Sequence, residues 1–303
     1  MTIAIIGAGA VGCYYAARLA RAQIPAVLLA RGTAFEKLRS HDVEVKSTAG
    51  NFQARVPVTD SIKDLKKSAT IILAVKCYDT DRVIEQIQPA VSNKTILLSL
   101  QNGVENEMKL AAAFGADKVA GAVCYIGAEI TGPGVVCHSA RGSVTFGELD
   151  GRVTDRIRQI HDTFAKAGVP STLSKNIQGD LWTKLAWNSA FNQVCAVARA
   201  TVGQALDSPK LTELLKQVMA EVVSVATAAG VRLDPQMIEK SLALSHNELR
   251  AVRPSMLQDL EKGRRLEHEA FGGFLVREGQ RLGIPVPVNA TLYQFLCHLD
   301  TQR

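Results

Sequence analysis

Three polar side chains that can act on a carbonyl compound recur at helical spacing in the second half of the chain. Lys184, Asn188 and Asn192 are four residues apart in the segment LWTKLAWNSAFN, so they share one face of a helix. A lysine ammonium can stabilise negative charge on a ketone oxygen and deliver a proton to it. Amides hydrogen-bond carboxylates and carbonyl oxygens, and they are costly to bury without partners. The spacing predicts a binding face for a small oxygen-rich substrate; the alternative is a polar stripe that faces solvent.

Two later polar residues are candidates for the same site, but each has a purely structural interpretation. Ser255 opens the segment SMLQDLEKGRRLE, and Glu267 follows it by twelve positions. Ser255 with Gln258 matches a helix capping box. Glu267 stands beside two other polar residues and would also suit an exposed acid.

A glycine-spaced turn near the N-terminus predicts a dinucleotide site. The apolar run 3–6 reads as a buried strand, the run 14–22 reads as a helix, and glycines lie between them at the spacing G-x-G-x-x-G. In such a turn the first glycine permits the tight bend, the second lets a pyrophosphate approach the backbone, and the third lets the helix lie close to the sheet. The first amides of the helix have no internal partner and favour phosphate. We expect the cofactor to contact the whole turn: Gly7, Ala8, Gly9, Ala10, Val11 and Gly12. The alternative is an ordinary glycine-rich turn.

The end of the second strand predicts which dinucleotide binds. Sites that prefer NAD carry an acidic residue about 20 positions after the glycines, where it holds the ribose 2′-hydroxyl. Here the run 25–30 ends at Arg31, and the nearest acid is Glu36. A guanidinium can grip a 2′-phosphate with two hydrogen bonds, whereas a carboxylate would repel it. The sequence therefore favours NADP; the alternative is a solvated surface arginine.

Two more polar residues follow predicted strands of the same sheet. Lys76 ends the run ATIILAVK, and Asn102 with Gly103 ends the run KTILLSLQNG. Ligands of open parallel sheets bind outside the carboxyl ends of the strands, which is where the glycine turn and Arg31 also fall. Taken singly, Lys76 also fits a solvated strand end and Asn102-Gly103 an ordinary turn. Their convergence on one rim favours a site.

The periodicity of apolar residues predicts an α/β chain in two domains. Continuous apolar runs predict buried strands at 3–6, 25–30, 69–76 and 94–103, shorter strands at 119–126, 134–138, 144–146 and 169–173, and a hairpin over 44–59. Helices are predicted at 14–22, 80–89 and 154–167, and then at 181–199, 210–230, 235–244, 255–260 and 267–282. We therefore expect a Rossmann-type, doubly wound parallel sheet over 1–173 that binds NADP, and an all-α substrate and catalytic domain over 174–303.

Composition excludes several classes of protein. The net charge of +6 suits an anionic ligand, but no dense Lys/Arg block indicates nucleic acid. No apolar run is long enough to span a membrane. The six cysteines are scattered without a C-x-x-C pair, so we expect reduced core thiols in a cytoplasmic protein and no metal ligands.

Together these motifs resemble the 2-dehydropantoate 2-reductase (ketopantoate reductase) family. GAGAVG, the AVK strand end, LQNG, LWTKLAWNSAFN, RPSMLQDLEKGRRLE and GIPVPVN stand in the family's order over nearly the whole chain. The resemblance implies an NADP-binding Rossmann domain followed by a helical domain like that of 6-phosphogluconate dehydrogenase. It also implies NADPH-dependent reduction of 2-dehydropantoate to (R)-pantoate, in pantothenate biosynthesis.

The resemblance assigns roles residue by residue. Lys184 matches the family's proton-donating lysine. Glu267 matches its cofactor-side glutamate, which would offset the ammonium or help to orient it or the nicotinamide ribose. Asn188, Asn192 and Ser255 match its substrate-binding residues, and Asn102 matches an asparagine that contacts both substrate and cofactor. Lys76 and a backbone contact near Ala128 match the remaining cofactor contacts.

Two departures bear on the substrate. The family has a substrate-binding asparagine three residues before the serine, where this chain has Val252. A second substrate-binding asparagine of the family is replaced near Val202. A sibling NADP-dependent reductase of another 2-oxo or 3-hydroxy acid is therefore the first alternative. A non-catalytic NADP-sensing protein is the second, although a sensor needs no proton donor. The apolar helical domain is compatible with a homodimer.

Overall fold

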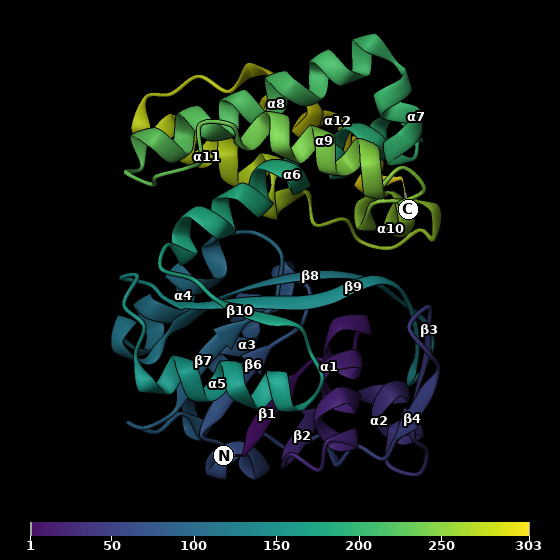
Figure 1. Ribbon diagram of the computed structural model, residues 1–303, viewed down its shortest axis with the longest axis vertical. Helices are drawn as coiled ribbons and strands as arrows, with labels where there is room; N and C mark the ends of the chain where they lie inside the picture. Colours follow the sequence, from purple (N-terminus) through teal and green to yellow (C-terminus); the bar gives the residue numbers. More distant parts are fainter. Residues whose placement is uncertain (1, 303) are drawn as a thin grey trace. The chain divides into compact units, whose positions relative to one another are not determined.

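The computed structural model describes residues 2–302 and contains a parallel five-stranded sheet in the N-terminal half (Figure 1). The order is β5 (Val58–Thr59), β2 (Ala26–Leu29), β1 (Ile3–Ile6), β6 (Thr70–Leu73) and β7 (Ile96–Ser99). The residues of β1 and β6 are all buried, as expected for strands that are covered on both faces. The predicted Rossmann-type fold is confirmed.

Helix α1 (Ala10–Arg21) packs between this sheet and a second sheet. The second sheet has the order β10 (Ser171–Leu173), β9 (Val135–Glu148), β3 (Val43–Ser47) and β4 (Phe52–Ala54), and β8 (Ala120–Gly132) also pairs with β9. Because both faces of α1 are covered, even Tyr15 and Leu19 are fully buried. The core on the other face of the parallel sheet includes apolar residues of α3 (Thr80–Ile87) and α4 (Glu105–Phe114).

The second sheet differs from the sequence prediction in two places. The two short strands predicted at 134–138 and 144–146 are one strand, β9. Arg141 and Gly142 have φ of 57° and 102°, so the strand passes through an irregularity that the sequence makes look like a turn. The predicted hairpin is correct for β3 and β4, which are antiparallel, but Val58–Thr59 instead joins the parallel sheet beside β2.

The C-terminal half is helical, as predicted. It contains α6 (Ile177–Ala198), α7 (Val202–Asp207), α8 (Pro209–Ala228), α9 (Met237–Glu248), α10 (Ser255–Glu261), α11 (Gly272–Leu282) and α12 (Pro287–Thr301), and α5 (Asp155–Lys166) precedes them (Figure 1). The predicted helix at 267–282 is a 3-10 turn (His268–Ala270) followed by α11. Helices α7 and α12 were not predicted.

The chain forms two compact units. One comprises the chain up to Gln101 together with Asn106–Ile177, and the other comprises Asn102–Glu105 together with the chain from Gln178 onward. All six cysteines are free. Cys13, Cys124 and Cys195 are buried, Cys77 and Cys297 are half-buried and Cys137 is exposed, so the expectation that every thiol lies in the core is wrong for the last three. None of the helices within residues 2–302 has the length and apolar character needed to cross a membrane.

Candidate active site

The glycine turn after β1 is too crowded for side chains at two of its three glycines. Gly7 has φ of 112°, and a Cβ there would lie 2.8 Å from Val75 Cγ1 and 2.9 Å from the Ala74 carbonyl oxygen. A Cβ on Gly12 would collide with the carbonyl oxygen of Gly7, at the close approach of helix to turn.

Gly9 differs from its two neighbours, because a Cβ there would meet only the Ala74 carbonyl oxygen, at 4.0 Å. Gly9 is also the N-cap of α1, its φ and ψ are −79° and −174°, and it offers no side chain to the first amides of the helix. The protein's own packing therefore leaves open the space over Gly9. An open backbone at an uncapped helix N-terminus fits the phosphates of a dinucleotide.

This contrast predicts opposite effects for two matched substitutions. We expect Gly12→Ala to lower Tm by roughly 2–10 °C, because the methyl group overpacks the turn. We expect Gly9→Ala to leave Tm unchanged and to raise the Kd for NADPH roughly tenfold or more, since the methyl group occupies the phosphate position. Thermal unfolding and NADPH titration of both variants test this. Loss of stability in Gly9→Ala, with normal NADPH binding, would contradict it.

Strand register brings the other predicted cofactor residues to the same edge of the sheet. Ile6 pairs with Leu29 and with Leu73, and Leu73 pairs with Ser99. The four strands therefore end level. Gly7 comes directly after β1, Arg31 two residues after β2 and Lys76 three residues after β6. Asn102 follows the end of β7 by three residues, and the next residue, Gly103, has φ of 90°. Ala128 lies further away in sequence, in the second sheet beside an irregularity of β8.

Arg31 is exposed at the start of α2 (Gly32–Leu38), and its guanidinium donates a hydrogen bond to the side-chain oxygen of Gln86 on α3. This bond restricts where the guanidinium can lie. Gln86 was not singled out from the sequence, because only the fold brings it to Arg31.

The polar stripe of the helical unit lies on α6, and two of its members are buried. Asn188 and Asn192 are 4% and 2% exposed, while Lys184, one turn earlier, is half-buried. The interpretation as a solvent-facing stripe is therefore wrong for the two asparagines. The stripe lies on a helix that is otherwise mostly apolar, next to Leu185, Ala186 and Phe191.

Hydrogen bonds join the stripe to the first turn of α10. Asn192 Oδ1 accepts from Ser255 Oγ at 3.1 Å and from the backbone N–H of Met256 at 3.0 Å. Asn192 Nδ2 donates to Asn188 Oδ1 at 3.2 Å. Asn188 Nδ2 is buried and has no hydrogen-bond partner. A buried donor without a partner is costly, so this nitrogen is available to hydrogen-bond an oxygen of a water or a ligand.

The purely structural interpretations of Ser255, as part of a capping box, and of Glu267, as an exposed acid, are both wrong. Ser255 is the first residue of α10 and not its cap, because Pro254 is the N-cap and Gln258 Nε2 donates to the Arg253 carbonyl oxygen. Glu267 is 6% exposed and is therefore no surface acid. The structure thus joins Ser255 to the two asparagines and buries Glu267 in the same unit.

The two valines that depart from the family pattern lie side by side. The N–H of Val202 donates to the carbonyl oxygen of Val252 at 3.0 Å. Val202 is fully buried as the first residue of α7, and Val252 is half-buried. The place in the fold where the resemblance leads us to expect asparagines is therefore apolar in this chain.

One member of a group of potential metal ligands in the helical unit already forms an ion pair with an arginine. His268, Glu269 and Cys297 offer ligand atoms within 4.8 Å of one another. However, the Glu269 carboxylate accepts hydrogen bonds from Tyr293 and from Arg277, the latter at 2.6 Å. Burial opposes ionisation of Glu269, but these two donors outweigh it and lower the pKa of its carboxyl. A guanidinium bonded to this carboxylate disfavours a cation there.

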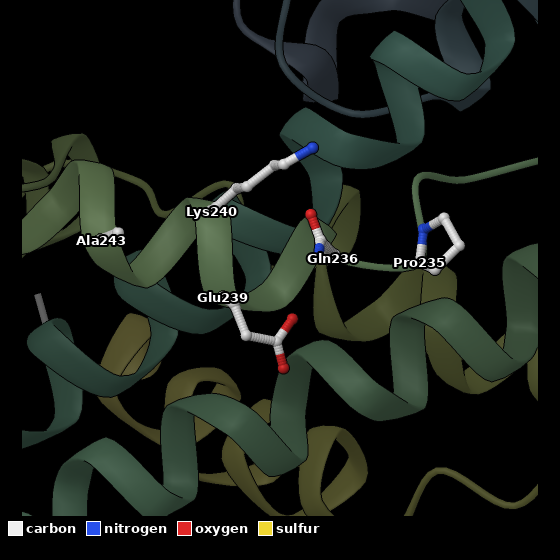
Figure 2. A pocket seen from close by; sticks show the side chains of 5 residues that line it. All are labelled: Pro235, Gln236, Glu239, Lys240 and Ala243. Atoms are coloured by element: carbon white, nitrogen blue, oxygen red, sulfur yellow. The ribbon is translucent and has the colours of Figure 1, made fainter.

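A shallow surface depression at the start of α9 holds none of the predicted residues (Figure 2). Its lining is Pro235, Gln236, Glu239, Lys240 and Ala243. The side chains of Glu239 and Lys240 extend in different directions and do not converge on a ligand position. Lys240 instead pairs with Asp234 at 2.5 Å. The depression therefore gives no support for a ligand site at the start of α9.

The fold and these residues define a class: an oxidoreductase with a Rossmann-type domain and a helical domain that carries polar, buried substrate-binding candidates. Residues 3–151 match the model of the family described as ketopantoate reductase PanE/ApbA, and residues 176–300 match the model of its C-terminal part. The chain belongs to this ketopantoate reductase family.

Individual relatives agree with the family assignment. The chain is 32% identical to a 2-dehydropantoate 2-reductase of Archaeoglobus fulgidus, over 96% of this chain and 95% of the relative. Its fold is similar to that of a PanE/ApbA family ketopantoate reductase from Ralstonia eutropha, with a TM-score of 0.91, 32% identity and coverage of 100% and 99%. It is also similar to a dimeric ketopantoate reductase from Staphylococcus aureus, with a TM-score of 0.84, 25% identity and the same coverage. The protein is thus an oxidoreductase of the CH–OH class that acts on a small keto acid with a nicotinamide dinucleotide.

Proposed function

We propose that the protein reduces 2-dehydropantoate to (R)-pantoate with NADPH. The observation that carries this proposal is the buried, unpartnered Nδ2 of Asn188, a residue one helical turn from Lys184 on α6. An amide donor and an ammonium on one helix face suit a substrate that carries a ketone and a carboxylate. The open backbone at Gly9 supports the cofactor half of the proposal.

Each residue then has a defined task. When bound, the reduced nicotinamide supplies the hydride to the ketone carbon. Lys184, as an ammonium, stabilises the negative charge that develops on the ketone oxygen and gives it a proton. Asn188 donates a hydrogen bond to a substrate oxygen, Ser255 helps hold the substrate, and Glu267 offsets the ammonium or orients the cofactor.

The cofactor contacts extend this proposal to the dinucleotide. Lys76 and Asn102 complete the contacts along the level strand ends, the backbone near Ala128 adds a contact from the second sheet, and Arg31 selects NADPH by binding its 2′-phosphate. We also propose a homodimer, because one similar reductase is dimeric, and a cytoplasmic location, which suits six unpaired cysteines. Light scattering of the purified protein tests the dimer, and a monomer mass would contradict it.

The pair of valines favours a second candidate, reduction of another 2-oxo acid. 2-Dehydropantoate carries a terminal hydroxyl, and Val202 and Val252 offer no side-chain partner to one. An apolar place in the fold suits a substrate with a wholly apolar side chain.

A matched pair of substrates decides between these candidates. Trimethylpyruvate has the skeleton of 2-dehydropantoate without the terminal hydroxyl. A site that hydrogen-bonds this hydroxyl rejects the analogue by roughly 10⁴-fold in kcat/KM, whereas an apolar site discriminates little. Strong preference for 2-dehydropantoate supports the first candidate, and equal or better use of trimethylpyruvate supports the second. If no 2-oxo acid oxidises bound NADPH, both candidates are wrong and a sensor is favoured.

A further inference from the structure

A series of buried hydrogen bonds joins the end of β7 to the first turns of α3 and α4. Ser99, Gln101, Thr80 and Asn106 take part, and none of these residues is more than 7% exposed. The hydroxyl of Ser99 donates to Gln101 Oε1 at 3.2 Å, and Gln101 Nε2 donates to Thr80 Oγ1 at 2.8 Å. Thr80 Oγ1 donates in turn to Asn106 Oδ1 at 3.0 Å. The bonds therefore run in one direction, from β7 through α3 to α4.

Thr80 stands at the centre of this series. It is fully buried and is the first residue of α3, whose N-cap, Asp79, makes no capping bond with its side chain. A threonine hydroxyl at a helix start usually serves the helix that it begins. A hydroxyl has a single proton, however, and that of Thr80 goes to Asn106, 26 positions further along the chain. The task of this hydroxyl is therefore a tertiary one.

The two partners of Thr80 flank the segment Asn102–Glu105. Gln101 directly precedes this segment, and Asn106 directly follows it. The N–H of Leu100 donates to the carbonyl oxygen of Leu73 at 2.8 Å, so the sheet holds the chain up to the residue before Gln101. Thr80 then holds the chain on both sides of the four residues that follow Gln101.

Polar side chains at this place need an explanation, because apolar residues could fill the same buried volume. Hydroxyl and amide groups are costly to bury until they are hydrogen-bonded. A satisfied network, unlike apolar packing, fixes distances and directions and so specifies one arrangement of the groups that it joins. The benefit falls on a residue that needs exact placement between the two ends. Asn102 is such a residue, since it is expected to contact both substrate and cofactor.

We propose that Thr80 is a positioning residue for Asn102: its hydroxyl links Gln101 to Asn106 and so fixes the segment that presents Asn102 to the ligand. The inference rests on the proposed function for the task of Asn102. It gives Thr80, Gln101 and Asn106 a part in the reaction although none of them needs to touch a ligand.

The substitution Thr80→Val removes the hydroxyl and keeps the shape of the side chain. We expect it to lower kcat/KM for 2-dehydropantoate roughly 10- to 100-fold, because small errors of placement are costly in a reacting complex. Thr80→Ser restores the hydroxyl, and we expect it to stay within about threefold of the wild type. Equal losses in both variants would overturn the proposal, since the hydroxyl would then not be the group that matters.

A double-mutant cycle tests whether Thr80 acts through Asn102. In the Asn102→Ala background there is no amide left to misplace, so we expect Thr80→Val to cost less than about threefold in kcat/KM. The same factor in both backgrounds would overturn the proposal. If Thr80→Val does not fold, the cycle is repeated with Gln101→Met, which removes one of the two bonds of Thr80, and additivity there has the same meaning.

Thr95 offers a matched control for the loss of a buried hydroxyl. It directly precedes β7, at the opposite end of the strand, and is 2% exposed. Its hydroxyl accepts from the N–H of Ser92 at 3.0 Å. We expect Thr95→Val to lower Tm about as much as Thr80→Val does, with kcat/KM unchanged. A comparable loss of kcat/KM in Thr95→Val would mean that both variants act through general destabilisation, which would overturn the proposal.

Hydrogen–deuterium exchange separates this inference from the proposed function, because it needs no substrate. We expect Thr80→Val to speed exchange of the amides of residues 102–106 roughly tenfold or more, through local opening, and Thr95→Val to leave them unchanged. Unchanged exchange in Thr80→Val would overturn the inference even in an active reductase. If the wild type binds NADPH but reduces no 2-oxo acid, the proposed function fails, and the cycle is measured in the Kd for NADPH. Non-additive loss of affinity then supports the inference, and additive loss overturns it.

Discussion

Replacing Lys184 with alanine is expected to lower kcat for 2-oxo acid reduction by roughly 10²–10⁴-fold, while the Kd for NADPH stays nearly unchanged. The reason is that the ammonium stabilises charge that exists only as the hydride is transferred. Its removal therefore affects the transition state more than the bound ground state. Steady-state NADPH oxidation and direct titration with NADPH measure the two quantities separately.

Two control variants make this result specific. Lys184→Arg keeps a positive charge but has no readily released proton, so we expect it to retain charge stabilisation and to remain slow. Lys216→Ala removes an exposed lysine from α8, in the same unit, and we expect normal turnover. Near-normal turnover in Lys184→Ala would remove this residue from the proposed role.

Replacing Arg31 with alanine is expected to weaken NADPH binding roughly 10- to 100-fold and to leave NADH binding almost unchanged. The guanidinium would make charge-assisted hydrogen bonds to the 2′-phosphate, which NADH lacks. Since Gln86 accepts a hydrogen bond from Arg31, we expect Gln86→Ala to give a smaller loss with the same selectivity. Titration of each variant with both cofactors measures this.

The matched control for Arg31 is another exposed arginine of the same region. Arg39 follows α2 and pairs with Glu36 at 3.2 Å. Arg39→Ala should leave both affinities unchanged. Equal losses of NADPH and NADH affinity in Arg31→Ala would contradict the 2′-phosphate assignment.

The parts of this fold that could be predicted are those set by local sequence. The strand Ile3–Ile6 and the glycines after it follow from short-range rules, because apolar strands and tight turns depend on neighbouring residues. The level strand ends that gather Gly7, Arg31 and Lys76 follow from the general geometry of parallel sheets.

Some of the parts that were missed depend on contacts between distant residues, whereas α7 was missed despite the local capping box of Thr201 and Gln204. Helix α12 was missed. The N–H groups of Val288 and Asn289 in the first turn of α12 donate hydrogen bonds to Glu221 of α8, far away in the sequence. Pro287 at the first position of α12 is a local start signal that the sequence prediction did not use, whereas the cap that Glu221 supplies from another helix leaves none. The bond between Asn192 and the Met256 N–H spans 64 residues and involves a backbone group, whose partner no residue type reveals. The sequence could identify Asn188 and Asn192 as candidates, but only the fold shows which way their amides point.

The central claim is that the protein transfers hydride from a nicotinamide to the ketone carbon of a 2-oxo acid. The most direct test uses NADPH that carries deuterium at the transferable position of the nicotinamide, with 2-dehydropantoate or trimethylpyruvate as acceptor. We predict that mass spectrometry finds one deuterium on the carbinol carbon of the 2-hydroxy acid, in amounts that match the cofactor oxidised. A protein that binds the labelled cofactor tightly, but yields no labelled 2-hydroxy acid from either substrate, would contradict the account.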